Sequence, residues 1–247
     1  MKTQPLQLDP PLVAALQGVT TATLTTVLLK RGLRNVWLRG TRPLHSSPSR
    51  LAGRAFTLRF VSAREDLATP ASWGSPISTR AAIEEMPPGC IAVVGALGCT
   101  GAGIFGDILC ARMRQRQVTA LITDGVVRDV AGVLETALPV WCQGTAAPPS
   151  VAGLTFVGWQ EPIDCGGVAV FPNDVIVADC DGAVLIPAAM LDEVVADAVE
   201  QERLEGWIMA QVSEGARLPG LYPPNEENKT RYAKWAANQR RGSAGDK

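Results

Sequence analysis

Apolar residues recur at helical spacing near the start of the chain and gather into short buried runs further along. The spacing predicts helices over residues 10–18 and 20–31, with Thr20 or Thr21 as N-cap of the second and Gly32 as its stop. Alternating apolar and polar positions predict a strand over 55–61. A short helix over 78–85 follows and ends before two consecutive prolines.

The middle of the chain alternates apolar runs with amphipathic segments. Strands are predicted over 90–95, 118–123 and 139–142, and helices over 107–115 and 129–137. This strand–helix order favours parallel pairing, with a helix at each crossover. Polar residues that follow the strands are therefore expected at one edge of a sheet.

The second half has shorter strands and tighter turns. Apolar runs at 155–157, 167–171, 175–178 and 183–186 are separated by turns rich in Pro, Asn, Asp and Gly. They predict a β-meander or partial barrel beside the parallel region. An acidic helix from 188 to about 215 and a charged helix over 225–241 complete an α/β chain with C-terminal helices.

The composition excludes several function classes. Of 247 residues, 47% are hydrophobic and 19% charged, with a formal net charge of -1, which does not suggest binding to nucleic acid. The long uncharged stretch at 86–106 holds six glycines and two prolines, so it is not expected to span a membrane. The first six residues lack an export signature. We expect a cytoplasmic protein.

Cysteine and histidine usage limits the metal chemistry. The six cysteines form no C-x-x-C pair and lie among apolar residues, as expected for reduced buried thiols. His45 is the only histidine, which excludes a multi-histidine zinc site and disfavours a Ser-His-Asp triad. A metal here should have oxygen ligands, which favours Mg²⁺ or Mn²⁺.

Charged residues cluster after two neighbouring strands of the parallel region. Asp124, Arg128 and Asp129 follow the strand at 118–123, and Asp107 follows the strand at 90–95. Open α/β folds bind ligands in the crevice beyond such strand ends. Arg128 could bind a carboxylate in bidentate fashion, and an Asp with waters suits magnesium. Adjacent opposite charges can also be a solvated surface pair of little energetic value.

The run Gly101-Ala-Gly-Ile-Phe-Gly106 matches G-x-G-x-x-G between a strand and a helix. A dinucleotide site would use this motif, but its first glycine comes several residues after the strand ends, and no second nucleotide-binding half is evident. The glycines can instead serve only turning and close packing. A third reading is an anion site at the backbone N–H groups of 106–109.

Two longer runs carry a resemblance to a known family. The first is Gly106-Asp-Ile-Leu109, then Ile122-Thr-Asp-Gly-Val-Val-Arg-Asp129 and Pro139-Val140. The second is Gly166-Gly-Val-Ala-Val-Phe-Pro-Asn-Asp174, then Ala178-Asp-Cys-Asp-Gly-Ala-Val-Leu-Ile-Pro187. Together they resemble the RraA-like family, which includes 4-hydroxy-4-methyl-2-oxoglutarate aldolases with oxaloacetate decarboxylase activity. The resemblance covers about residues 20–205.

The resemblance implies a swivelling β/β/α core assembled as a homotrimer or dimer of trimers. It implies that Arg128 binds the substrate and stabilises an enolate, and that Asp129 holds a divalent metal mostly through waters. It also implies substrate binding by the backbone of Gly106, Asp107, Ile108 and Leu109. An acid from the C-terminal helix of an adjacent subunit can complete such sites, and the candidates here are Glu200, Glu202 and Glu205.

The chain is longer than the family's shorter members. We expect residues 1–215 to form a single RraA-like catalytic domain and residues 216–247 a C-terminal helical extension. The extension and the charged cluster at 64–67 indicate a longer subgroup, whose substrate can differ from the methylated aldol.

The predicted function is that of a divalent-metal-dependent carbon–carbon lyase acting on a small 2-oxo acid. It would cleave a 4-hydroxy-2-oxo acid or decarboxylate oxaloacetate through a pyruvate enolate, with Asp107, Asp124 or a metal-bound water as general base. Neither motif contains a lysine, which disfavours a Schiff base. Three alternatives stay open: a dehydratase of 2-oxo-3-deoxy sugar acids, a non-catalytic regulator of the ribonuclease E type, and an NAD(P)-dependent oxidoreductase.

Overall fold

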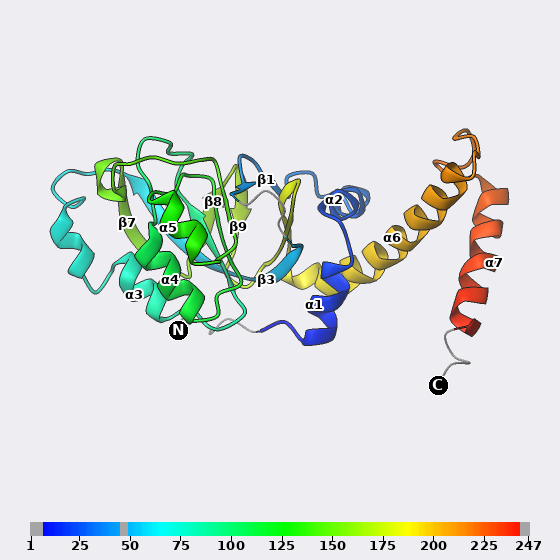
Figure 1. Ribbon diagram of the computed structural model, residues 1–247, viewed down its shortest axis with the longest axis horizontal. Coiled ribbons are helices and arrows are strands. Elements are labelled where there is room, and N and C mark those ends of the chain that lie inside the picture. Colours follow the sequence, from blue (N-terminus) through cyan, green and yellow to red (C-terminus); the bar gives the residue numbers. More distant parts are fainter. Residues whose placement is uncertain (1–6, 45–48, 243–247) are drawn as a thin grey trace.

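One long strand, β3 (Leu51–Ser62), joins the two halves of a nine-stranded sheet in the computed structural model, which describes residues 7–44 and 49–242 (Figure 1). The strands on one side of β3 run parallel to it in the order β4 (Ile91–Gly95), β5 (Ala120–Thr123) and β6 (Val140–Cys142). On its other side, β10 (Val175–Asp179) and β11 (Gly182–Ile186) form an antiparallel hairpin. The predicted parallel region is confirmed.

The two ends of the sheet are brought together by a short turn. β1 (Trp37–Leu38) pairs with β11, and β2 (Arg42–Pro43) pairs with β6 at the opposite end. Only residues 39–41 separate β1 from β2. The sheet therefore curls toward closure as a partial barrel, which includes the parallel strands as well as β10 and β11. β7 (Leu154–Trp159) pairs antiparallel with the last five residues of β3, from Leu58 to Ser62.

A small ribbon, β8 (Ile163–Cys165) with β9 (Val168–Val170), packs against the inner face of this curled sheet. Alternation along the strands divides the core, because successive side chains point to opposite faces. On β4, Ile91 and Val93 face the ribbon, whereas Ala92 and Val94 face the helices outside. The curled sheet thus has one inner core and two outer ones.

Two groups of helices cover the outer faces (Figure 1). One group covers the parallel strands and consists of α3 (Thr79–Glu84), α4 (Asp107–Gln115) and α5 (Val130–Glu135). The other covers the β10–β11 hairpin and consists of α1 (Pro10–Gln17), α2 (Thr21–Lys30) and the first half of α6 (Leu191–Ser213). Asp179 fixes the start of α2, since its carboxylate accepts bonds from the Thr21 N–H and Oγ1 at 2.9 and 2.7 Å.

The second half of α6 runs away from the sheet, and α7 (Glu226–Gly242) folds back along it (Figure 1). A separate apolar cluster joins the two helices and includes Trp207, Ile208, Leu221 and Tyr232. Among the described helices, none alone is long and apolar enough to cross a membrane. Taken together, α1 and α2 are long and apolar enough to span a membrane, but the two helices are bent by 98° relative to each other.

Most predicted elements are present within one or two residues of their expected ends. The strands β1, β2 and β8 were not predicted, because they have only two or three residues each, and β1 and β2 also depend on distant partners for their hydrogen bonds. It also missed three short 3-10 helices, η1 (Pro70–Gly74), η2 (Ser150–Ala152) and η3 (Ala188–Met190). His45 and the first six residues lie outside the described residues.

Candidate active site

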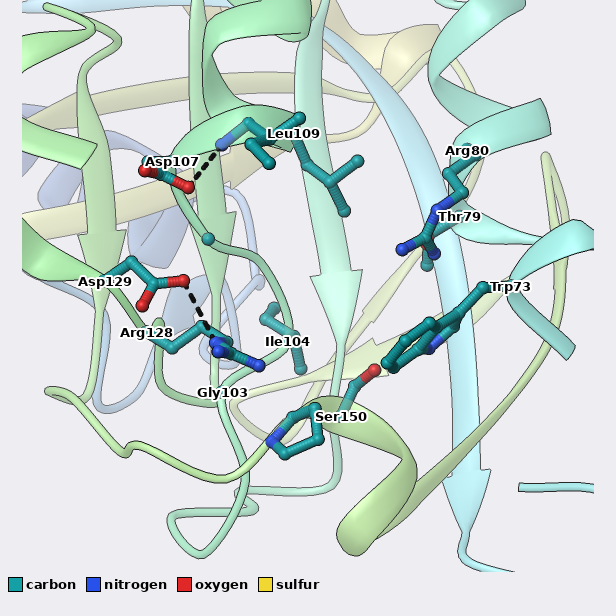
Figure 2. Close-up of a pocket in the computed structure, with 13 residues that line it drawn as sticks. Trp73, Thr79, Arg80, Gly103, Ile104, Asp107, Leu109, Arg128, Asp129 and Ser150 are labelled. Carbon is teal, nitrogen blue, oxygen red and sulfur yellow. Dashed lines mark hydrogen bonds and ion pairs between the residues drawn. The ribbon is translucent and has the colours of Figure 1, made fainter. Parts of the chain in front are cut away.

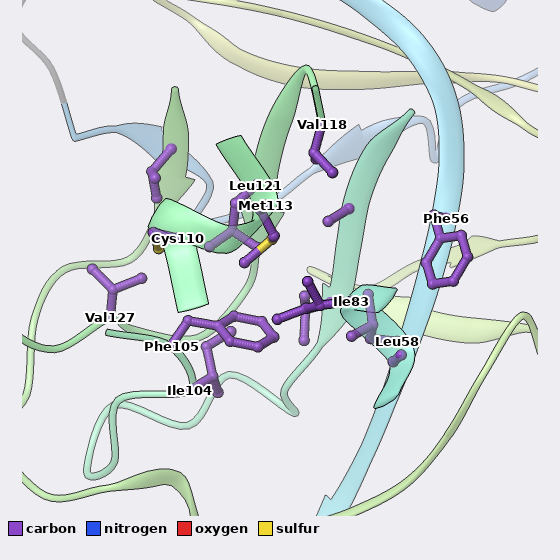
Figure 3. Close-up of a cluster of buried hydrophobic side chains, with 14 of the residues drawn as sticks. Phe56, Leu58, Ile83, Ile104, Phe105, Cys110, Met113, Val118, Leu121 and Val127 are labelled. Atoms are coloured by element: carbon purple, nitrogen blue, oxygen red, sulfur yellow. The ribbon is translucent and has the colours of Figure 1, made fainter. Parts of the chain in front are cut away.

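The glycine-rich loop after β4 runs beside the segment that follows β5. Backbone bonds join the two: the Ile104 N–H donates to Val126 O and the Arg128 N–H to Phe105 O, both at 2.9 Å. Ile104 and Phe105 are buried in the core beneath α3 and α4, where they anchor the loop (Figure 3). Two strand ends that are distant in sequence are therefore held together at the start of α4.

A pocket of about 250 Å³ opens at this junction (Figure 2). The first turn of α4, from Gly106 to Leu109, forms one part of its wall, and Arg128 and Asp129 form the adjacent part. The structure thus brings together most of the site residues expected from the sequence.

Arg128 and Asp129 form an ion pair, with Arg128 Nε 3.0 Å from Asp129 Oδ2. Their side chains are 34% and 47% exposed, so the direct energetic value of the pair is small. The two terminal nitrogens of Arg128 make no hydrogen bond to the described residues, which leaves them available to an anion. Asp129 itself has a left-handed backbone, with φ at 52°, and is the N-cap residue of α5. Such conformations in non-glycine residues often occur at functional sites.

Three glycines allow the close approach of these charged groups. A Cβ on Gly106 would lie 2.6 Å from Asp129 Oδ2, and one on Gly103 would lie 2.7 Å from Arg128 Cβ. A Cβ on Gly132 would lie 2.8 Å from both Cβ and Oδ2 of Asp107. By contrast, Gly101, the first glycine of the motif, has no atom within 4 Å of its would-be Cβ. The motif therefore makes room for Arg128 and Asp129, a use that a dinucleotide site does not explain.

Asp107 is half-buried in the first turn of α4 and lines the pocket. Its Oδ1 accepts the N–H of Ile108 at 2.7 Å, a bond that holds the carboxylate at the helix start. No bond to Oδ2 is formed by the described residues. Asp107 and Asp129 are thus the two carboxylates that line the pocket.

Asp124 occupies a different place from the one expected. It is 3% exposed, and its carboxylate accepts the N–H groups of Ala96 at 2.7 Å, Gly98 at 3.1 Å and Gly166 at 3.2 Å. It does not line the pocket. Its oxygens are engaged by backbone amides, so the geometry favours a structural role, tying the loop after β4 to the turn after β8, over a role as general base.

The three glutamates of α6 do not line the pocket of their own chain, which is built from η1, α3, α4 and the segments around Arg128 and Ser150. Glu202 Oε2 accepts the Thr20 N–H at 3.2 Å, and Glu205 accepts the Thr23 hydroxyl at 3.4 Å. Glu200 accepts the Tyr232 hydroxyl at 2.7 Å and pairs with Arg203. These contacts join α6 to α2 and α7.

The opposite wall of the pocket was missed from the sequence. Trp73 of η1 and Thr79 and Arg80 of α3 face Arg128 and Asp107 across the pocket (Figure 2), and Ser150 closes the base of that wall. Trp73, Thr79 and Arg80 precede β4 in the chain, and the pairing of β3 with β4 brings their segment to the site, whereas Ser150 comes from η2, after β6. Aromatic residues make up only 5% of the chain, and Trp73 lies in a mostly polar loop. Its presence there was the signal in the sequence that this loop could contribute to a binding site.

The donor set of the pocket fits a hard divalent cation. The lining offers the carboxylates of Asp107 and Asp129 and has neither histidine nor cysteine. Gly106 leaves open the space beside Asp129 that a side chain would fill. Oxygen ligands and room for water suit Mg²⁺ or Mn²⁺. A second acidic group, Asp179 with Cys180 and Asp181, is less suitable, because bonds from Thr21 and from the Asp181 N–H engage Asp179.

Comparisons with known proteins agree with this geometry. The family model described as "RraA-like: Aldolase/RraA" matches residues 21–185, which include every strand from β1 to β10 and the whole pocket. The chain belongs to the RraA-like family.

Solved structures have the same fold. Streptomyces coelicolor RraAS2, described as an unusual member of the RNase ES inhibitor RraA protein family, is 33% identical, with a TM-score of 0.73 over 82% of this chain and 97% of that one. An uncharacterised Pseudomonas syringae protein aligns with a TM-score of 0.77 over 90% of this chain and 98% of its own, at 22% identity, which supports the fold alone.

A curated relative carries an activity in its name. The Halalkalibacterium halodurans protein "Putative 4-hydroxy-4-methyl-2-oxoglutarate aldolase" is 29% identical over 130 residues, or 52% of this chain. The match spans 61% of that relative's length. Such similarity is compatible with a lyase, and the RraAS2 description shows that the family is also associated with ribonuclease inhibition.

Proposed function

We propose that this protein is a divalent-metal-dependent lyase that cleaves a carbon–carbon bond of a 2-oxo acid. The observation that carries the proposal is the shared pocket of Arg128, Asp129 and Asp107 at the first turn of α4. A fixed guanidinium, two carboxylates and a helix start are the groups needed to bind an acid and stabilise an enolate.

Arg128 would hold the oxo-acid end of the substrate. Its terminal nitrogens are free of protein partners among the described residues, and Asp129 fixes the side chain through Nε. A planar guanidinium can donate two parallel bonds to a carboxylate or to adjacent oxygens of a 2-oxo acid. As a bond at C3 breaks, negative charge moves onto the C2 oxygen, and Arg128 stabilises that charge without reorganising.

Asp107 is the proposed general base for retro-aldol cleavage. It accepts the proton of the 4-hydroxyl group while the C3–C4 bond breaks, and C4 leaves as a carbonyl group. The electron pair of that bond forms the C2–C3 enolate, and protonation at C3 gives pyruvate. Decarboxylation of oxaloacetate passes through the same enolate, with CO₂ as the leaving group and no base required.

Asp129 would hold the metal. Asp107, the other carboxylate of the pocket, would act as the base and not as the principal metal ligand. A bound Mg²⁺ or Mn²⁺ would supply Lewis-acid stabilisation of the developing oxyanion. No lysine lines the pocket in the described part of the chain, so the residues offer no amine for a Schiff base. This donor set favours the metal-dependent route.

We further propose a homotrimer or dimer of trimers in which a neighbouring subunit contributes to the site. The pocket is open beside Ile108, which is 79% exposed although apolar. Glu200, Glu202 and Glu205 of α6 contact α2 and α7 and do not line the pocket of their own chain, so we propose that any role for them there requires another copy.

The test is pyruvate release by the wild-type chain and the Arg128→Ala variant, with 4-hydroxy-2-oxoglutarate and Mg²⁺. Loss of one group that stabilises a transition-state oxyanion lowers kcat by about 10²–10³-fold. The matched control is Arg34→Ala, since Arg34 is exposed and lies outside the pocket. Near-normal turnover by Arg128→Ala would refute the assignment.

The similarity to RraAS2 supports a second candidate, a non-catalytic ribonuclease regulator. Such a protein would need a docking surface and neither the metal nor Arg128. Absence of turnover by the wild-type chain on every 2-oxo acid tested, together with inhibition of an RNase E-type enzyme that survives Arg128→Ala, would favour it.

A further inference from the structure

Arg80 is a second cation on the wall opposite Arg128. It belongs to α3, while Trp73 beside it belongs to η1, in the segment between β3 and β4 that forms this wall (Figure 2). The guanidinium carbon of Arg80 lies 5.1 Å from the centroid of the Trp73 ring. Stacking on an aromatic ring favours this position of the guanidinium by about 0.5–1 kcal/mol at an exposed site and leaves its edges free to donate hydrogen bonds.

The charge of Arg80 is not neutralised by the protein. Nearby arginines have carboxylate partners: Arg64 pairs with Asp66, and Arg112 with Glu84, both at 2.6 Å. Arg80 has no carboxylate within 4.0 Å in the described part of the chain, and its guanidinium lies over the Trp73 ring. Arg80 is exposed to solvent, and an unpaired guanidinium that lines a pocket is suited to bind an anionic group of a ligand.

The position of Arg80 decides which anionic group it could bind. The 2-oxo acid end of the substrate is assigned to Arg128 and the start of α4, on the opposite wall. The pocket of about 250 Å³ lies between the two walls, so a small ligand can contact both. An anionic group at the far end of the same molecule would then meet Arg80.

We propose that Arg80, supported by Trp73, binds the distal carboxylate of a dicarboxylic 2-oxo acid and sets the preference for dianionic over monoanionic substrates. The proposal rests on the proposed function for the orientation of the ligand. Arg80 is a specificity-determining residue here, because it would contact a substrate group that does not react.

The turnover test uses two substrates of equal length that both release pyruvate. 4-Hydroxy-2-oxoglutarate has a carboxylate where 4-hydroxy-2-oxopentanoate has a methyl group. The ratio of their kcat/KM values should fall by about 10- to 100-fold in Arg80→Gln, as expected for loss of a charge-assisted hydrogen bond. Arg80→Lys should give an intermediate ratio, since it keeps the charge but not the planar fork. The control, Arg34→Gln, should keep the wild-type ratio.

The binding test does not depend on turnover. 2-Oxoglutarate and 2-oxopentanoate lack the 4-hydroxyl group, so neither can undergo the retro-aldol reaction. Calorimetric titration in the presence of Mg²⁺ should show that the wild-type chain binds 2-oxoglutarate more tightly, and that Arg80→Gln reduces the difference about 10-fold or more. Trp73→Leu should reduce it less, by roughly 2- to 5-fold, because only the support for Arg80 is lost.

The two tests separate the two proposals. Arg80-dependent preference for 2-oxoglutarate without pyruvate release from any substrate would overturn the lyase and leave the carboxylate site standing. Pyruvate release with an unchanged substrate ratio in Arg80→Gln would overturn the role of Arg80 and leave the lyase standing. An equal loss on both substrates would also overturn it, because a structural defect does not distinguish a carboxylate from a methyl group.

Discussion

Replacing Gly106 by Ala should damage the site while sparing the fold. The backbone of Gly106 is extended, with φ at -118° and ψ at -171°, so alanine is sterically allowed there. Its Cβ, however, would lie 2.6 Å from Asp129 Oδ2, about 0.8 Å inside the 3.4 Å at which ordinary contact begins. The Asp129 carboxylate, or the start of α4, must therefore move by most of an ångström.

The expected effects follow from that displacement. A misplacement of about 1 Å at a reacting site can cost about 10²-fold in rate, so kcat/KM should fall by about 10- to 100-fold. Alanine is also a poorer N-cap than glycine, which should lower stability by roughly 0.5–1 kcal/mol. For a chain of this size, that corresponds to a decrease in Tm of about 1–4 °C. The variant should thus lose most of its activity while it stays folded.

The same motif provides the matched control. Gly101→Ala places its Cβ where no atom lies within 4 Å, so pyruvate release and Tm should both remain near wild type. Both variants are assayed for pyruvate release with Mg²⁺ and for thermal unfolding. Equal damage by the two substitutions, or full activity of Gly106→Ala, would refute this account of the loop. Tight NAD(P) binding that is lost in Gly101→Ala would instead favour a dinucleotide site.

Two further predictions concern buried groups outside the pocket. Asp124→Ala leaves three backbone N–H groups without their acceptor, so the free energy of unfolding in urea should fall by about 3–5 kcal/mol; an unchanged urea midpoint would contradict the structural role. Burial raises the pKa of the Cys90 and Cys110 thiols to about 12, so a thiol reagent at pH 8 should label the exposed Cys180 quickly and these two only after unfolding. Because their folded-state pKa values lie above the unfolded value near 9.0, stability should decline as the pH rises from about 9 toward 12.

The sequence contained enough local information to predict the central part of the site. Arg128 and Asp129 follow β5, and Asp107 follows the neighbouring β4, so their proximity follows from parallel pairing alone. Asp124 follows the same strand, yet its carboxylate is directed to the amides of Ala96, Gly98 and Gly166. The direction of a side chain just after a strand depends on the turn that follows, which the apolar pattern does not specify.

The opposite wall of the pocket could not be predicted from the sequence, because it depends on contacts between distant segments. Trp73 and Arg80 reach the pocket because β3 pairs in parallel with β4 and the segment between them returns over the site. No local pattern fixes the path of such a segment. The strands β1 and β2 were missed for a similar reason, since two residues have no periodicity and their hydrogen bonds come from β11 and β6.

We propose above all that the protein forms pyruvate in a metal-dependent reaction at the Arg128–Asp129 pocket. The most direct measurement is pyruvate release from 4-hydroxy-2-oxoglutarate and from oxaloacetate, first in Mg²⁺ or Mn²⁺ and then in excess EDTA, with subtraction of an enzyme-free blank containing the same metal. We predict release that falls by at least about 100-fold in EDTA, returns on addition of metal, and is absent at every metal concentration in Asp129→Ala. Release that is unaffected by EDTA, or that keeps its response to metal in Asp129→Ala, would contradict the account.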